Sequence, residues 1–222
     1  MRLESGRNFP ADAQFQMGMT CALPRIGTSL SLVSSPALPD IENERDLALM
    51  RLIASGDESA MRELIERHQN RVYGTIVRML GSEREAEDLA QQVFVRVWKS
   101  SGRYQPSAKF TTWLYTIVRN LVFNESRRRT RADLQDSVDD EMRDDQQKTP
   151  SAELLDAEKM SAIQSAIDAL PEQQRMAIIL RRYEEMPYEE MAIVLKQTVP
   201  GVKSLLFRAR TALRESLAKY LE

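Results

Sequence analysis

The sequence predicts an all-α protein of two small helical domains, joined by a flexible acidic linker, with a helix-turn-helix in the second domain. Three observations support this prediction. Apolar residues recur every three or four positions from about residue 41 onward, which is the period of a helix with one buried face. Glycine is scarce, with 8 among 222 residues, and runs of β-branched residues are short. The helical period is interrupted between residues 132 and 156, where acidic residues dominate.

The composition narrows the possible function classes. Hydrophobic residues make up 42% of the chain, charged residues 29%, and the net charge is −2, so overall charge does not indicate a nucleic-acid partner. A single cysteine, Cys21, excludes a disulfide framework within the chain and fits a reducing compartment. With one histidine, His68, a zinc site built from Cys and His is also excluded, and we expect no cofactor. His68 is interpreted as a surface or helix-packing residue.

Two segments are expected to lie outside the folded domains. Residues 1–40 have neither a helical period nor the continuous apolar core of a signal peptide, so they are expected to form a disordered extension. Residues 132–156 are expected to form the linker, because 132–158 hold ten acidic residues against Arg143 and Lys148. No apolar run reaches the length of a membrane span, so we expect a cytoplasmic protein without membrane insertion.

Residues 41–131 are expected to form the first domain. Gly56 and Asp57 predict the end of one helix and the N-cap of the next, and Gly81 and Ser82 predict a second break of the same kind. A helix over 83–100 and a loop, "SGRYQPSA", follow. The helix that starts near residue 109 then carries an apolar stripe with spacings of three and four, formed by Phe110, Trp113, Leu114, Ile117, Val118, Leu121 and Val122.

The same helix has a basic character that its stripe does not explain. Between Arg103 and Arg131 there are seven Lys or Arg residues and one acid, Glu125. The helix ends in "SRRR", and Tyr115 and Phe123 are expected on faces other than the stripe. This concentration of positive charge predicts a negatively charged partner.

Residues 157–222 are expected to form the second domain. Pro171 suits the first turn of a helix whose inner face holds Met176, Ile179, Leu180 and Tyr183, and Pro187 opens a short helix. "KQT" is the turn, and Thr198 is the expected N-cap of the last helix. A short helix, a tight turn and a longer basic helix are the plan of a helix-turn-helix.

The last helix has the side chains that DNA recognition requires outside its apolar stripe: Lys203, Ser204, Phe207, Arg208 and Arg210. Lysine and arginine bind phosphates, a serine hydroxyl donates to or accepts from base edges, and a phenyl ring contacts a thymine methyl. Thr198 and the amides of the first turn form a positive helix end that suits phosphate. The alternative interpretation is a three-helix bundle with a solvated basic face.

Both halves together resemble the extracytoplasmic-function (ECF) type of bacterial RNA polymerase sigma factors. The first half does so through "RVYGTIVRMLGSEREAEDLAQQVFVRVWK" and "KFTTWLYTIVRNLVFNESRRR", and the second through "LPEQQRMAIILRRYEEMPYEEMAIVL" and "VKSLLFRAR". The match covers about residues 45–131 and 157–220. The resemblance implies a two-domain helical protein without enzymatic activity that binds core RNA polymerase and promoter DNA to direct transcription initiation. An anti-sigma factor is a further expected partner.

The resemblance also implies roles for individual residues. Core-polymerase binding is expected at Asp88, Gln91, Gln92 and Phe94. The −10 promoter element, opened to a single strand, is expected to be bound by Tyr104, Lys109, Arg119, Asn120, Arg127, Arg128 and Arg129, with the last three on phosphates. The −35 element is expected to be bound by Thr198, Lys203, Ser204, Phe207, Arg208 and Arg210.

Some positions depart from the family pattern. Lys196 stands where the turn usually carries a glycine, Pro200-Gly201 replaces the more frequent Gly-Thr, and Leu205 stands where a basic residue is common. A proline is tolerated in the first turn of a helix, so we expect the fold to be retained. The missing cation and hydroxyl are expected to affect recognition of the −35 element.

Two other function classes fit parts of the sequence. A helix-turn-helix regulator that does not join polymerase would account for the second domain but not for the motif of the first. A structural adaptor would leave both basic faces merely solvated. An enzyme is not predicted, because the sequence has no glycine-rich phosphate loop, nucleophile elbow or metal cluster.

Overall fold

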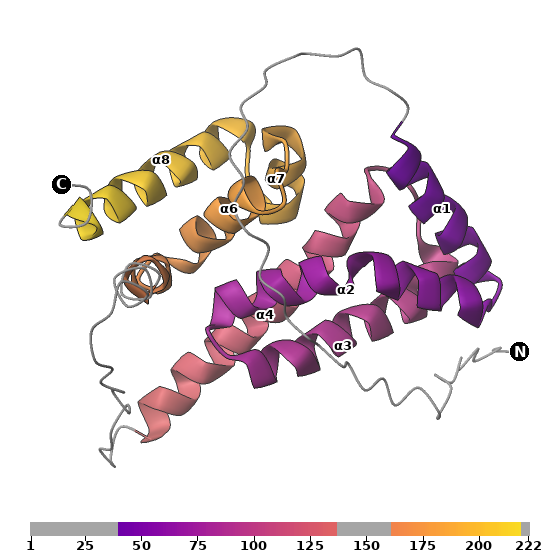
Figure 1. Cartoon of the computed structure of the whole chain (residues 1–222), viewed down its shortest axis with the longest axis horizontal. Coiled ribbons are helices and arrows are strands. Elements are labelled where there is room, and N and C mark those ends of the chain that lie inside the picture. Colours follow the sequence, from indigo (N-terminus) through magenta and orange to yellow (C-terminus); the bar gives the residue numbers. More distant parts are fainter. Residues whose placement is uncertain (1–39, 137–160, 219–222) are drawn as a thin grey trace, which may run out of the picture.

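The computed structural model describes residues 40–136 and 161–218. The prediction of an all-α fold is confirmed, since these residues form helices and connecting loops and no strand. The expectations for the N-terminal extension and for most of the acidic linker concern residues that lie outside this described part. We call residues 40–136 the first unit and residues 161–218 the second unit (Figure 1).

The first unit contains α1 (Ile41–Ala54), α2 (Glu58–Leu80), α3 (Glu83–Ser100), a short 3-10 turn η1 (Ser101–Arg103) and α4 (Phe110–Asp136). The predicted caps define the helix ends. The Asp57 side chain accepts hydrogen bonds from the amides of Ser59 and Ala60, and Ser82 caps α3. Gly81 ends α2 with φ at 68°, in the left-handed region that glycine adopts without steric cost.

Helix α4 continues beyond the expected domain end at residue 131 and reaches Asp136. The added turn contains Ala132, Leu134 and Gln135, which all favour helix, so the acidic residues that begin there do not end it. The first residues assigned to the linker therefore belong to the first unit.

The second unit consists of a helical segment at 161–168, α6 (Glu172–Arg182), α7 (Tyr188–Leu195) and α8 (Val199–Ser216). Pro171 and Pro187 are the N-cap residues of α6 and α7, one position before the first turn. The Thr198 side chain accepts a hydrogen bond from the Gly201 amide, as an N-cap residue does. The expected helix-turn-helix is thus formed by α7 and α8.

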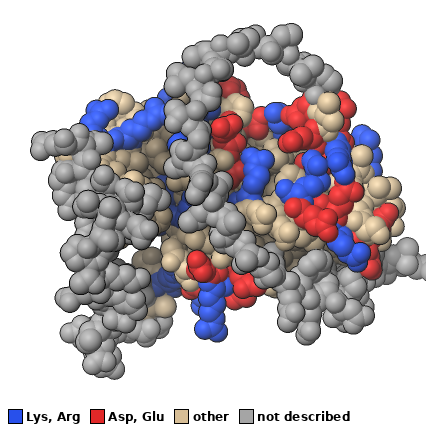
Figure 2. All heavy atoms as spheres, in the orientation of Figure 1, with Lys and Arg blue, Asp and Glu red and all other residues tan. Residues whose placement is uncertain are grey.

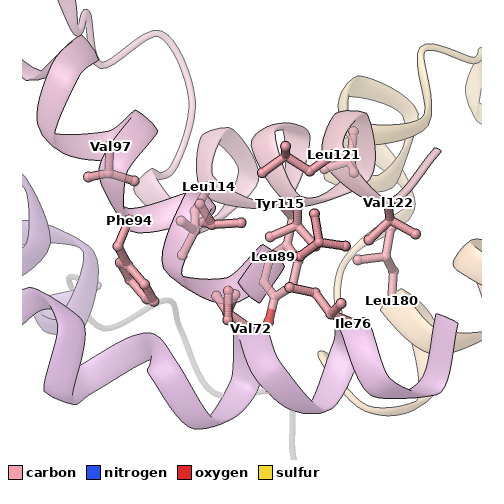
Figure 3. Packing of buried hydrophobic residues seen from close by; sticks show 14 of the residues in the cluster. Val72, Ile76, Leu89, Phe94, Val97, Leu114, Tyr115, Leu121, Val122 and Leu180 are labelled. Carbon is pink, nitrogen blue, oxygen red and sulfur yellow. The ribbon is translucent and has the colours of Figure 1, made fainter. Parts of the chain in front are cut away.

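The two units pack directly against each other. Helix α6 lies along α2, α7 lies against α4, and buried residues of both units form one hydrophobic cluster. Figure 3 shows Leu180 of α6 beside Val122 of α4, and both side chains, like that of Ile76 in α2, are fully buried. In this conformation the expected two domains therefore share a core.

The burial of several residues differs from what the sequence predicted or left open. Tyr115 and Phe123, expected outside the apolar stripe of α4, are 2% and 3% exposed. Tyr183 was expected on the inner face of its helix but is 44% exposed, because it is the C-cap residue at the end of α6. One face of its ring lies under the Arg78 guanidinium. His68 is a buried helix-packing residue, with Nε2 2.9 Å from Oδ2 of Asp46.

Candidate nucleic-acid interface

Helix α8 presents a basic surface on the side away from its core. Its apolar stripe, formed by Val202, Leu205, Leu206 and Ala209, is buried. Figure 2 shows Lys and Arg side chains gathered over α8. The five side chains predicted to bind the −35 element from within this helix are all exposed, and they line one open hollow together with Tyr188 and Leu206: Lys203, Ser204, Phe207, Arg208 and Arg210.

Phe207 is the most informative of these residues. It is 72% exposed, although a phenyl ring of a helix that packs on a core is usually buried. It stands among cations and a serine hydroxyl rather than among other exposed apolar groups. Thr198 is also exposed, at the N-terminal end of the same helix. Leu205 is 7% exposed, so a cation at this position would face the core of the second unit.

The start of α4 and the loop before it form a second surface. The Tyr104 ring packs against Trp113, with ring centroids 4.7 Å apart, and these two residues line a hollow with Arg96, Ser100, Arg103, Gln105 and Ile117. Burial raises the pKa of the Tyr104 hydroxyl. Trp113 was expected only in the apolar stripe, and Arg96 was not among the predicted site residues, because residues of α3 and α4 come together here only in the folded chain.

The polar residues of α4 are more constrained than the sequence predicted. Arg119 donates a hydrogen bond from Nη1 to Oδ1 of Asn120 at 3.0 Å, and its guanidinium lies 4.5 Å from the centre of the Phe123 ring. Burial lowers the pKa of Arg119. Lys109 Nζ lies 2.8 Å from Oδ2 of Asp40, and the hydrogen bond to that carboxylate raises the pKa of Lys109.

The three consecutive arginines at the end of the basic stretch, Arg127 to Arg129, have different surroundings. Arg127 is exposed. Arg128 is exposed and pairs with Glu125, with Nη2 2.6 Å from Oε1. Arg129 is half-buried, donates to the Leu80 carbonyl oxygen at 2.8 Å and pairs with Glu85. Arg129 therefore joins α4 to the turn between α2 and α3, in addition to any contact with a ligand.

Helix α3 divides cleanly into two faces. Asp88, Gln91 and Gln92 are exposed, as expected for residues that contact a partner. Phe94 is 3% exposed and belongs to the hydrophobic cluster. Its ring packs in the hydrophobic core beneath α3 and is not accessible to a partner in this conformation.

Comparison with known proteins shows the family of the chain. The protein family described as "Sigma-70 region 2" matches residues 64–132, and the family described as "Sigma-70, region 4" matches residues 160–213. The RNA polymerase sigma-H factor of Pseudomonas aeruginosa is 30% identical over 82% of this chain and 98% of its own length. The ECF RNA polymerase sigma-E factor of Haemophilus influenzae is 31% identical over 79% of this chain and 97% of its own length. The chain belongs to the ECF group of sigma-70 RNA polymerase sigma factors.

Solved structures show the same fold as this sigma factor. The protein CnrH, in a complex with the cytosolic domain of CnrY, matches with a TM-score of 0.60 and 24% identity, over 79% of this chain and 98% of the CnrH chain. The sigma factor RpoE of Bartonella quintana, in a complex with the anti-sigma factor NepR, matches with a TM-score of 0.56 and 23% identity, over 71% and 96% of the two chains.

Two further properties of this sigma factor concern the described residues only. Their acidic, histidine and cysteine side chains form no group of three or more that could hold a metal ion. None of the helices between residues 40 and 136 or between 161 and 218 combines the length and the apolar character that crossing a membrane requires.

Proposed function

We propose that this sigma factor binds core RNA polymerase and directs it to promoters by contacting two DNA elements. Helix α8 inserts into the major groove of the −35 element, with Ser204 and Phe207 at base edges. Thr198, Lys203, Arg208 and Arg210 contact the phosphates on either side. The observation that carries this assignment is the exposure of Phe207 among cations on the second helix of a helix-turn-helix.

The −10 element binds the first unit as a single strand. The hollow beside Tyr104 and Trp113 has the aromatic faces on which an unstacked base packs, and Arg96 and Arg103 lie at its edge. Lys109, Arg119 and Asn120 extend the surface along α4. Arg127, Arg128 and Arg129 continue it with positive charge toward the backbone of the strand.

The exposed residues of α3 contact core polymerase. Asp88, Gln91 and Gln92 form this contact, and Phe94 positions the helix from the core. An anti-sigma factor is a further proposed partner, because the similar RpoE was solved with the anti-sigma factor NepR. The place of action is the cytoplasm, where polymerase and promoter DNA are found.

The deciding experiment is reconstitution with core RNA polymerase. The chain is expected to co-elute with core enzyme in size-exclusion chromatography, and the complex is expected to start transcription from promoters that core enzyme alone does not use. A regulator that binds DNA without joining polymerase would remain separate from core enzyme and would leave its transcription unchanged. That result would refute the proposed function.

A further inference from the structure

The start of α4 receives its cap from another helix. The first residue of α4 is Phe110, and Lys109 before it has no side-chain oxygen that could accept a hydrogen bond from an amide of the first turn. Asn43 of α1 supplies such an oxygen. Its Oδ1 accepts a hydrogen bond from the Phe110 amide at 2.8 Å, although the two residues are 67 positions apart. Asn43 therefore holds the backbone of α4 at its first turn.

Two acidic residues adjoin Asn43 on the surface of α1. Asp40 and Asp46 stand three positions before and three positions after it. Oδ2 of Asp40 lies 2.8 Å from Lys109 Nζ, but both side chains are nearly half exposed, so water screens this ion pair. Asp46 is buried, and both of its oxygens are engaged by side chains of α2. Asn43 thus makes the least screened of the contacts between this part of α1 and the start of α4.

The residue that Asn43 holds carries a ring that supports the hollow of the proposed −10 surface. Phe110 is fully buried, and its ring centroid lies 6.3 Å from that of Tyr104 and 5.9 Å from that of Trp113. The rings of Tyr104 and Trp113 line the hollow. Because packed side chains transmit displacements to their neighbours, a shift of Phe110 moves both of these rings.

Ring packing orients Tyr104 in this arrangement. Its hydroxyl is buried and has no hydrogen-bond partner among residues 40–136 and 161–218. Its amide donates a hydrogen bond to the Ser101 carbonyl oxygen at 3.2 Å, which fixes the backbone of the turn but not the ring. The position of the Tyr104 ring therefore depends on Phe110 and Trp113, and through Phe110 on Asn43.

We propose that α1 is a positioning element for the hollow that receives an unstacked base of the −10 element, and that Asn43 is its main contact. Asn43 does not touch DNA. It holds the first turn of α4 so that Tyr104 and Trp113 form a preformed platform on which the base packs. A preformed platform binds more tightly, because less ordering is required on binding. The inference rests on the proposed function, which supplies the base.

Loss of this cap is expected to weaken DNA binding by a limited and selective factor. Replacement of a capping side chain by alanine shifts a helix equilibrium by about two- to thirtyfold. If the first turn of α4 is ordered in a smaller fraction of molecules, the apparent affinity for the −10 strand falls by that fraction. The proposed contacts of α3 with core polymerase and of α8 with the −35 duplex lie on other surfaces, so they are expected to be unaffected.

The first measurement follows the loop 104–109 in the full chain without DNA. A spin label on Ser107→Cys, an exposed position, reports the mobility of the loop by electron paramagnetic resonance in a Cys21→Ser background. Asn43→Ala is expected to increase this mobility. Asn43→Asp keeps an oxygen acceptor at the helix start and is expected to retain the mobility of the parent. Asn70→Ala makes the alanine change at an exposed position of α2 and is the matched control.

The second measurement uses holoenzyme assembled from the unlabelled chain and core RNA polymerase. Fork-junction DNA, with a duplex −35 element and a single-stranded −10 element, is selected from a random pool by the parent holoenzyme. Asn43→Ala is expected to bind this DNA at least about threefold more weakly, whereas Asn43→Asp and Asn70→Ala bind it like the parent. Affinity for core enzyme, and binding of the −35 duplex by the full chain, are expected to be the same for all four proteins.

A double-mutant cycle separates positioning from a general structural effect. Tyr104→Ala removes one ring of the platform. If Asn43 acts through this ring, adding Asn43→Ala to Tyr104→Ala is expected to weaken fork-junction binding by a smaller factor than Asn43→Ala does alone. If Asn43→Ala fails to fold by circular dichroism, Asn43→Gln replaces it, because it keeps the amide and moves the oxygen by one carbon.

Unchanged loop mobility in Asn43→Ala would overturn the anchor. Increased mobility with unchanged fork-junction binding, or equal factors in the two backgrounds of the cycle, would overturn the positioning role. A parent holoenzyme that selects no fork junction would refute the proposed function and the positioning role with it. The spin label involves no DNA, so it decides independently whether Asn43 holds the loop.

Discussion

His68 Nε2 lies 2.9 Å from Oδ2 of Asp46, and both side chains are buried where α1 crosses α2. The other oxygen of Asp46 accepts a hydrogen bond from Arg67 Nε at 2.9 Å, and the His68 ring packs against Phe110 at the start of α4. This cluster fixes the loop end of α4, where the proposed −10 surface begins.

Asp46→Ala is therefore expected to lower the free energy of unfolding by about 3 kcal/mol, because it leaves buried polar groups of α2 without their partner. Urea denaturation followed by circular dichroism measures this change. Glu66→Ala, at an exposed position of α2, serves as the control and is expected to shift stability by less than about 0.5 kcal/mol. A similar small effect of Asp46→Ala would contradict a stabilising role for the cluster.

Lys196→Gly is expected to stabilise the protein by about 1 kcal/mol. Lys196 ends α7 with φ at 54° and ψ at 48°, a left-handed conformation that is unfavourable for a residue with a Cβ atom. Glycine adopts this conformation freely. Thermal unfolding measures the change, and Lys196→Ala is the control, since alanine keeps the Cβ atom and is expected to give no gain.

Glu172→Gln is expected to stabilise the protein at neutral pH. Burial raises the pKa of Glu172 above the ordinary value of 4.5, in spite of nearby Ser126, Arg127 and Arg119. A carboxyl with a raised pKa binds its proton more tightly in the folded state, so its contribution to stability is lost as pH rises through that pKa. Unfolding experiments across pH are expected to show the advantage of the glutamine growing above about pH 4.5 and then levelling. A constant difference at all pH values would contradict the raised pKa.

Asp88→Arg is expected to weaken binding of core RNA polymerase by roughly tenfold or more, because it reverses a charge on the proposed contact face of α3. Helical content is expected to be unchanged, since the side chain is exposed. Titration of core enzyme with labelled sigma factor measures the affinity. Glu66→Arg on α2 makes a comparable charge change elsewhere and is expected to bind normally. Equal affinities for all three proteins would reject α3 as the contact.

Lys203→Ala is expected to reduce the slope of log affinity against log salt concentration by roughly 1 for a −35 duplex, because one phosphate contact is removed. Ser204→Ala and Phe207→Ala are instead expected to change the preference among duplex sequences. Both effects are measured on the full chain with duplexes selected from a random pool. Arg182→Ala, an exposed change on α6, is the control for the loss of positive charge. An unchanged slope for Lys203→Ala would exclude its phosphate contact.

Local features of the fold were predictable from the sequence. Asp57, Gly81, Ser82 and Thr198 define helix ends where their chemistry predicts them, because a cap depends on hydrogen bonds and dihedral angles within a few residues. The exposed face of α8 was predictable for a related reason. The period of the apolar residues fixes which side of a helix turns to a core, and the remaining side chains then face outward.

Contacts between distant segments were not predictable in this way. The period of α4 indicated one buried face, but Tyr115 and Phe123 are buried as well. The neighbouring residues Arg127, Arg128 and Arg129 looked equivalent in the sequence. Arg129, however, donates a hydrogen bond to the Leu80 carbonyl oxygen in the turn between α2 and α3, and no local sequence pattern predicts this contact.

The sequence by itself determined the helices, the ends that carry a capping residue and the exposed face of α8, since these follow from interactions between residues a few positions apart. Only the tertiary structure decided what covers each face. Arg71 and Glu184 are 113 positions apart, and no periodicity relates them. Their pairing depends on how the apolar surfaces of the two units fit together. The hydrophobic effect is non-directional, so a sequence pattern does not indicate which apolar surfaces will pack against each other.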